Sequence, residues 1–171
     1  MKRSILYVTV ASVLLLSTIG LFPQEETKNP ISFRKLIKFL VDIEGFKAEK
    51  PKGQNIKMGN FKASEANRDY ANDTVRFNVK IADYSHYPMM KKGFEMMGNF
   101  EVDSTEKLLK KVKMDGYTGI MEIEFERKRA KFIVILDNSV LVIIEGKDVE
   151  DKEDLMKFVN NFDIKAISLL K

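Results

Sequence analysis

The side chains in this chain that are best suited to metal binding are a single histidine and the methionines that follow it. The histidine is His86, and Met89 and Met90 come directly after it, with Met96 and Met97 further along. Imidazole and thioether groups suit Cu(I), a metal that is also handled outside the cytoplasm. His86 and Met89 are therefore candidate metal ligands.

The same methionines also fit a role in packing. At helical spacing, Met90, Phe94 and Met97 form one stripe. Stripes of this kind usually fill a core, because methionine adapts to irregular gaps. A pliable surface for a lipid or a protein is the other interpretation. We expect Met90, Phe94 and Met97 to lie mainly in the core, we keep them as candidate ligand-binding residues, and we expect no bound cofactor.

The sequence indicates no catalytic set of residues. Ser85 and Asp83 are neighbours of His86 in sequence only, and the Gly-x-Ser-x-Gly pattern of a nucleophile elbow is absent. One histidine without any cysteine leaves only carboxylates to complete a zinc site. We assign no catalytic residue. An extracytoplasmic hydrolase that uses dispersed carboxylates is the alternative.

Two groups of acidic residues have simpler explanations than catalysis. Glu122, Glu124 and Glu126 share the polar face of one predicted strand, which is typical of a solvated ladder beside basic neighbours. The acidic residues between 148 and 154 crowd a predicted helix start, where the helix dipole favours negative charge. They lack the spacing of an EF-hand calcium loop.

The first 22 residues read as an export segment. Lys2 and Arg3 precede an uncharged run of 18 residues from Ile5 to Phe22, which is the pattern of a secretory signal peptide. Thr18 and Gly20 fit a cleavage site only loosely, and about 20 residues suffice for a membrane span. An uncleaved N-terminal anchor is therefore the alternative, with membrane contact through residues 5–22. Both interpretations place the rest of the chain outside the cytoplasm, in the periplasm or secreted.

Composition beyond this segment indicates one domain without nucleic-acid binding. The chain has 29 basic and 25 acidic residues, and without Lys2 and Arg3 the balance is 27 to 25. The charges are mixed along the chain rather than gathered into a basic stripe. Cysteine is absent, so stability depends on packing. We expect a tether over residues 23–31 and a single α+β domain over residues 32–171.

Apolar periodicity predicts the elements of this domain. Helices are expected over 33–40 and 88–97, and from Asp148 or Asp151 onward. Strands are expected after Gln54 and over 74–83, 108–114, 117–125, 131–136 and 140–145, with Gly53 breaking regular structure and Gly146 ending a hairpin. Residues 164–170 read as a short strand or tail. The expected core comprises Val75, Phe77, Val79, Ile81, Ile133, Ile135, Val142 and Ile144. This pattern predicts an α+β fold in which helices cover a mostly antiparallel sheet.

Two stretches carry a resemblance to known proteins. At Gly116-Tyr117-Thr118-Gly119, and at the hairpin ending Val142-Ile143-Ile144-Glu145-Gly146 with the helix after it, the chain resembles small exported bacterial proteins of uncharacterised role. Its element order over about 54–169 is similar to the Mog1/PsbP-like fold. The resemblance implies an α/β/α sandwich whose members mostly bind other proteins or have no known activity, and it transfers no functional residue.

The sequence therefore predicts an exported, non-catalytic binding or interaction domain. Its partner is an unknown protein or a hydrophobic ligand. The alternatives are the hydrolase described above and a copper- or lipid-binding protein that uses the methionine-rich helix.

Overall fold

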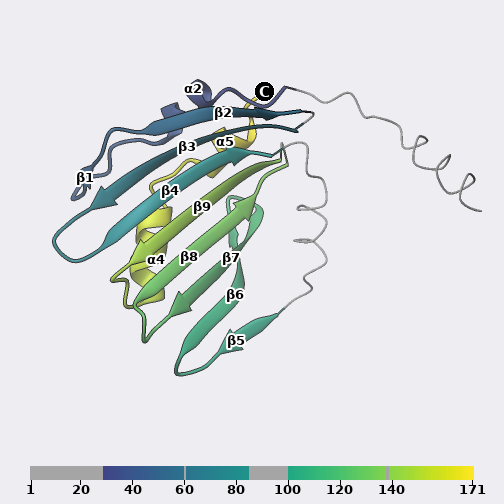
Figure 1. The fold of residues 1–171 in the computed structure, drawn as a ribbon. Coiled ribbons are helices and arrows are strands. Elements are labelled where there is room, and N and C mark those ends of the chain that lie inside the picture. The colour runs from purple at the N-terminus through teal and green to yellow at the C-terminus, as the bar shows by residue number, and fades with distance from the viewer. Residues whose placement is uncertain (1–28, 60, 85–99, 138) are drawn as a thin grey trace, which may run out of the picture.

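The computed structural model describes residues 29–59, 61–84, 100–137 and 139–171, about half of which form one large sheet (Figure 1). In this described part the sheet has nine strands in the order β1-β3-β4-β9-β8-β7-β6-β5, with β2 also paired to β3. Each pairing between these strands is antiparallel. The strands are β1 (Lys47–Ala48), β2 (Lys52–Met58), β3 (Phe61–Ala71), β4 (Arg76–Asp83), β5 (Glu101–Asp103), β6 (Lys107–Met114), β7 (Tyr117–Glu124), β8 (Arg129–Ile135) and β9 (Val140–Lys147).

Short helices accompany the sheet, and side-chain caps explain where three of them begin. The helices are α2 (Phe33–Leu36), which continues into the 3-10 helix η1 (Ile37–Phe39), α4 (Lys152–Val159) and α5 (Ile164–Ser168). A cap side chain that accepts a backbone N–H satisfies a donor that the first turn leaves free. Ser32 accepts from Arg34, Asp151 from Asp154 at 2.9 Å, and Asp163 from Ala166 at 2.8 Å. The helix predicted over 88–97 lies outside the described residues.

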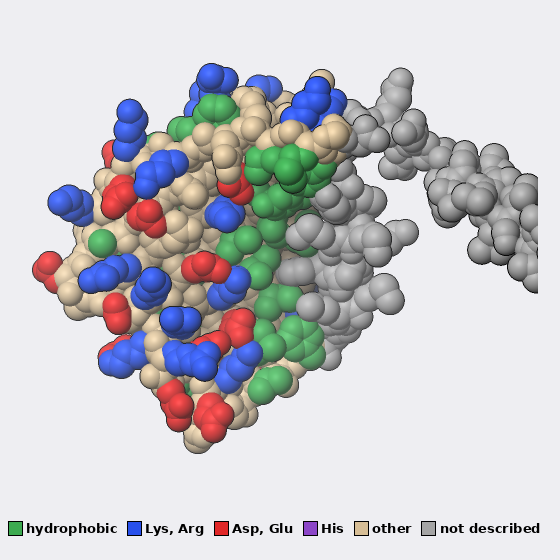
Figure 2. Space-filling model, in the orientation of Figure 1, with side chains coloured by type: hydrophobic (Ala, Val, Ile, Leu, Met, Phe, Trp, Pro, Cys, Tyr) green, Lys and Arg blue, Asp and Glu red, His purple; other side chains and the backbone are tan. Residues whose placement is uncertain are grey.

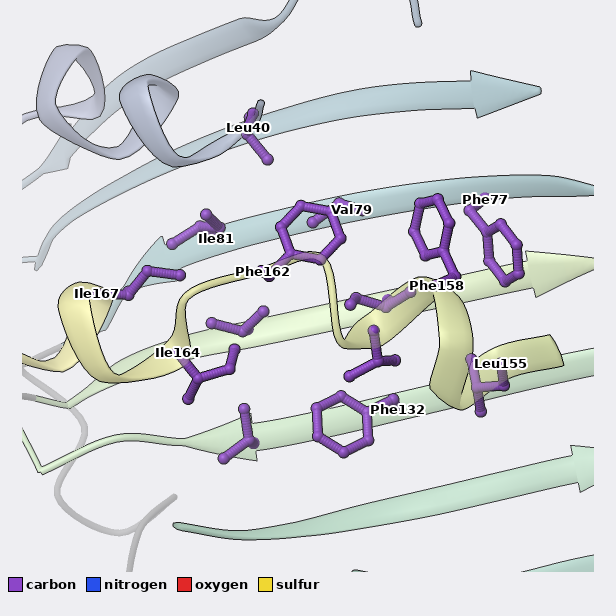
Figure 3. Close-up of a cluster of buried hydrophobic side chains, with 14 of the residues drawn as sticks. Leu40, Phe77, Val79, Ile81, Phe132, Leu155, Phe158, Phe162, Ile164 and Ile167 are labelled. Carbon is purple, nitrogen blue, oxygen red and sulfur yellow. The ribbon is translucent and has the colours of Figure 1, made fainter. Parts of the chain in front are cut away.

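One face of the sheet, which we call the inner face, packs against α4 and α5 (Figure 3). Phe158 of α4 and Phe162, which follows this helix, point toward the sheet. Ile164 and Ile167 of α5 do the same. They meet strand residues that are almost fully buried, namely Val79, Ile81, Phe132, Val134, Val142 and Ile144. The opposite face is called the outer face below.

Aromatic side chains fix the position of α4 on the inner face. The ring of Phe158 stacks on Phe77, with centroids 3.9 Å apart and an interplanar angle of 13°. Tyr70 and Phe46 approach the same ring edge-on, at 5.4 and 5.0 Å. Aromatic pairs in stacked and edge-to-face geometry add to the free energy of burial. The helix is therefore attached to both β3 and β4.

The prediction for the core was wrong at one strand. Ile133 and Ile135 were expected inside, but they are half-buried on the outer face, while Phe132 and Val134 are fully buried. Apolar residues occupy successive positions in β8, so alternation does not identify the inward set. A shift of one residue exchanges the faces of a whole strand. The inward sets predicted for β4 (Phe77, Val79, Ile81) and for β9 (Val142, Ile144) are confirmed. Val75, also expected in the core, lies just before β4 and is only partly buried against the core.

Three element boundaries also differ from the predictions. Residues 164–168 form the helix α5 rather than a strand. Gly53 and Gly146 lie within β2 and β9 rather than ending regular structure. At Gly146 an added Cβ would lie 2.6 Å from Val149 Cγ2 and 2.8 Å from Phe77 Cε1. Glycine at this position permits close packing, which is the other common role of glycine in a strand.

The α+β class and the mostly antiparallel sheet are confirmed. The helices within the described residues all add side chains to the core on the inner face, including Leu36, Leu155 and Ile164. The described part is therefore a sheet with helices on one side.

A half-buried arginine, Arg68, fastens the loop between η1 and β2 to the sheet. The Arg68 guanidinium donates to the carbonyl oxygens of Leu40 and Glu49, both at 2.6 Å, and to Asp42 Oδ1 at 2.5 Å. The Tyr70 hydroxyl donates to the Val41 carbonyl at 3.0 Å. These bonds satisfy loop carbonyls that would otherwise need water.

A second polar pair fixes the point where the chain enters the domain. Asp83 Oδ2 accepts from the Ile31 amide at 2.7 Å, and the Ser64 hydroxyl donates to the Ile31 carbonyl. Ser64 and Asp83 are register partners on β3 and β4, and both are buried. Ile31, at the end of the expected tether, is itself buried.

Tyr70, whose hydroxyl donates to the Val41 carbonyl, makes the stability of the domain depend on pH. Burial raises its pKa to about 12, although Arg68 acts in the opposite direction. The unfolded chain loses the phenol proton near pH 10, so the stabilisation is complete below pH 10 and is lost as the pH rises toward 12. We expect the free energy of unfolding, measured by urea denaturation, to fall over this range by about 1–3 kcal/mol more in the parent than in Tyr70→Phe.

The Tyr70→Phe variant also loses one hydrogen bond, which should cost about 1 kcal/mol at neutral pH. Tyr84, whose pKa burial also raises, is present in both proteins and cancels from the comparison. Equal losses of stability between pH 10 and 12 would contradict this account of Tyr70.

Candidate functional site

The residues that the sequence singled out for binding lie outside the described part of the structure. Met90, Phe94 and Met97, the candidate ligand-binding residues, belong to residues 85–99, as do the candidate metal ligands His86 and Met89. The copper, lipid and core interpretations of this segment all stay predictions.

The outer face of the sheet carries an apolar band at one end of its strands. Successive residues of a strand point to opposite faces, so Leu141 and Ile143 lie outside because Val142 and Ile144 are in the core. The register continues this band across the sheet from Ile143 to Ile133 and Ile120. Figure 2 shows such a band of hydrophobic side chains beside a face of intermixed charges. Its members are Ala82, Ile120, Ile133, Ile135, Leu141 and Ile143.

A ladder of ion pairs lies next to the apolar band along the strands. Lys131 of β8 and Glu145 of β9 are register partners, with Nζ and Oε1 2.7 Å apart. Glu122 of β7 pairs with Lys107 of β6 at 2.5 Å. The solvated ladder predicted for the β7 glutamates is confirmed at Glu122 and Glu124. Glu126 departs from the prediction, because β7 ends at Glu124 and Glu126 lies in the turn that follows.

The far end of the same strands carries a line of basic residues. Lys147 of β9 is the register partner of Arg76 on β4 and of Arg129 on β8. Beyond Arg76 the line continues through Ala71 to Lys47 on β1. All four basic side chains are exposed. We call Lys47, Arg76, Lys147 and Arg129 the cationic row.

Two hollows open on either side of Lys147. One has a volume of about 440 Å³ and contains Glu122, Glu124, Arg129, Lys131 and Glu145 in its lining. The other has a volume of about 580 Å³ and is lined by Lys47, Glu49, Asp69, Ala71, Arg76, Asn78, Glu145 and Lys147, together with parts of Tyr70 and Phe77. Both volumes fall within the range of ligand sites in proteins.

The turn that precedes β8 is tied to the residues that follow β9. Lys128 hydrogen-bonds Glu150 at 2.5 Å, and this bond raises the pKa of the lysine. The Val149 amide donates to the Lys128 carbonyl at 3.0 Å, and the Val149 side chain is fully buried. The ends of β8 and β9 that carry Arg129 and Lys147 are therefore held together.

Within the described residues, no group of three or more His, Cys, Asp or Glu side chains is arranged to hold a metal ion. None of the helices in this part of the chain is long and apolar enough to cross a membrane.

Sequence reasoning missed the cationic row. Its members come from four strands, and Arg76 and Lys147 are neighbours only through the register of β4 and β9. The available signal was the basic residue at the polar end of each predicted strand. To know which of these strand ends are neighbours one needs the order of the strands in the sheet, and hydrophobic periodicity does not give that order.

Comparisons with known proteins identify no family for this chain. No family model matches it, and no curated protein matches it. Its fold is similar to the X-ray structure of an uncharacterised protein from Mycobacterium smegmatis, with 9% sequence identity and a TM-score of 0.41. The match covers 84% of this chain and 98% of the other.

Proposed function

We propose that the protein is an exported, non-catalytic binding or interaction domain, and that the charged part of the outer face is its recognition surface. The observation that carries the proposal is the ordered pattern of charge on this face, where ion pairs between strands border the two hollows. The hydrogen-bonded register of β4 and β6–β9 positions these charges before any partner arrives. Preorganisation of this kind lowers the cost of binding, and complementary charge gives specificity.

The carboxylates of the smaller hollow support binding over acid–base catalysis. Glu122, Glu124 and Glu145 each pair with a separate basic side chain, Lys107, Arg127 and Lys131 respectively. Hydrolysis by two carboxyl groups relies on contrasting environments that give one the role of acid and the other that of base or nucleophile. These three carboxylates have similar surroundings, which suit recognition of a patterned surface.

The finer fold assignment, an α/β/α sandwich of the Mog1/PsbP-like kind, belongs to the same proposal. The chain between Tyr84 and Phe100 joins β4 to β5, which are separated in the sheet by β9, β8, β7 and β6. Five strand spacings amount to roughly 24 Å, and the helix predicted over 88–97 would supply about 15 Å of that span. If this segment crosses the outer face, the stripe of Met90, Phe94 and Met97 would meet the apolar band.

Replacement of Ile143 by aspartate tests this arrangement. Under the sandwich proposal a charge at Ile143 is buried without a partner, so the free energy of unfolding should fall by several kcal/mol. Thr118→Asp is the matched control, because Thr118 is exposed on the outer face of β7 and should change stability by less than about 0.5 kcal/mol. If urea denaturation gives similar midpoints for the two variants, the second helical layer is refuted.

Export is tested by a fusion of alkaline phosphatase after Lys28. The enzyme is active only outside the cytoplasm, so the export proposal expects an active fusion, and charge reversal of Lys2 and Arg3 should reduce that activity. Mass spectrometry of the native N-terminus then separates cleavage near Gly20 from an intact anchor. An inactive but stable fusion protein would refute export.

The recognition surface is tested by exchanging the charges of one ion pair. Lys131→Glu combined with Glu145→Lys keeps the net charge and the pair but inverts the local pattern. Lys128→Glu with Glu150→Lys is the control, because this pair links the turn before β8 to the residues after β9. We expect sedimentation with isolated cell-envelope material of the producing organism to weaken by about tenfold or more for the first exchange only. Equal binding by both exchanged proteins would refute this surface.

A further inference from the structure

We propose that the cationic row binds a phosphate group in the hollow of about 580 Å³ between β1, β3, β4 and β9. This inference rests on the proposed function, since it names the ligand chemistry of the same outer face. Lys47, Arg76 and Lys147 line the hollow, and Arg129 lies on the other side of Lys147.

The first argument is the register of like charges. Arg76 lies directly opposite Lys147, and Lys147 lies directly opposite Arg129. On its other side Arg129 lies opposite Glu124 of β7, whose ion pair is with Arg127. Like charges that face each other across neighbouring strands destabilise a sheet. Among the described residues, no ion pair or hydrogen bond is formed by the side chains of Arg76, Lys147 or Arg129. An anion bound between them would remove the repulsion.

The second argument is that the nearby acidic groups already have partners. Three carboxylates line the same hollow, namely Glu49, Asp69 and Glu145. Glu145 pairs with Lys131 at 2.7 Å, Glu49 lies 3.6 Å from Lys52, and Asp69 accepts from the Asn78 amide at 2.7 Å. The lining itself carries three basic and three acidic side chains. Lys52 and Lys131, which lie outside it, compensate Glu49 and Glu145, so three basic side chains remain against Asp69 alone. The excess is carried by the cationic row.

The third argument is the shape of the site. Ala71 lies between Lys47 and Arg76 in the register, and its short side chain leaves space between the two longer ones. On the other side, Gly146 packs closely against Phe77 and Val149, which fixes the backbone beside Lys147. The basic side chains therefore surround an open space on a firmly held backbone.

Phosphate fits this arrangement better than a carboxylate does. A phosphate monoester carries about 1.5 to 2 negative charges at neutral pH, which matches the excess of two positive charges. The guanidinium of Arg76 offers paired donors for oxyanions, and lysine ammonium groups act as mobile point charges beside it. A free phosphate compound and a lipid headgroup share this chemistry.

The test uses the exported protein with inorganic phosphate as the probe. Amide NMR signals are followed during titration with phosphate, and with chloride at matched ionic strength. We expect phosphate alone to shift the signals of Ala71, Arg76 and Lys147 in a saturable manner. Arg76→Gln with Lys147→Gln should weaken this response by about tenfold or more. Lys57→Gln with Lys113→Gln, which removes two exposed lysines elsewhere, should leave it unchanged.

Two further readouts separate ligand sources and structural effects. The parent should sediment with phosphatidylcholine vesicles containing phosphatidic acid, whose headgroup is a phosphate monoester, if the ligand is a headgroup, and should bind only inorganic phosphate if the ligand is free. The Arg76→Gln, Lys147→Gln protein should melt at a higher temperature than the parent in low salt, because the repulsion is relieved. Added phosphate should raise the melting temperature of the parent only.

The proposal is overturned if chloride reproduces the shifts, if both double variants respond alike, or if neither phosphate nor the vesicles bind. The proposed function is judged separately by the exchange of Lys131 and Glu145. If that exchange abolishes envelope binding while Arg76→Gln with Lys147→Gln retains it, the outer face is a recognition surface without a phosphate site.

Discussion

The ring of Phe158 lies between the sheet and the loop before β1, and the two-sided character of the molecule depends on its contacts. It stacks on Phe77 and meets Tyr70 and Phe46 edge-on. Because these contacts attach α4 to the inner face, the residues on that face of the sheet are buried in the core. Alternate residues of each strand must then face outward. The apolar band, the ion-pair ladder and the cationic row are consequences of that burial.

The outer face shows how a stable sheet can carry an unfavourable arrangement of charge. Arg76, Lys147 and Arg129 lie side by side in the register, and their exposure to solvent limits the repulsion between them. The inner face supplies the stability that tolerates this repulsion, through side chains such as Val79, Phe132 and Ile144 that are completely buried.

Sequence patterns were most informative where polar and apolar residues alternate strictly. The inward residues of β4 and β9 and the helix start near Asp151 follow from period and capping chemistry. The patterns were least informative in β8, where Phe132, Ile133, Val134 and Ile135 are all apolar and either face could have been the core. They also failed at 164–168, where the Asp163 cap and contacts with the sheet favour a helix.

The sequence by itself determined the antiparallel α+β class, the positions of most strands and the presence of a charged ladder at Glu122 and Glu124. These features depend on neighbours within a few residues, and local periodicity records them. Only the tertiary structure decided which face of β8 is buried and which strands are adjacent. The cationic row exists because β4, β8 and β9 are neighbours in one register, although Arg76 and Lys147 are far apart in the chain. Strand order is set by the packing of the whole sheet, so no local pattern contains it.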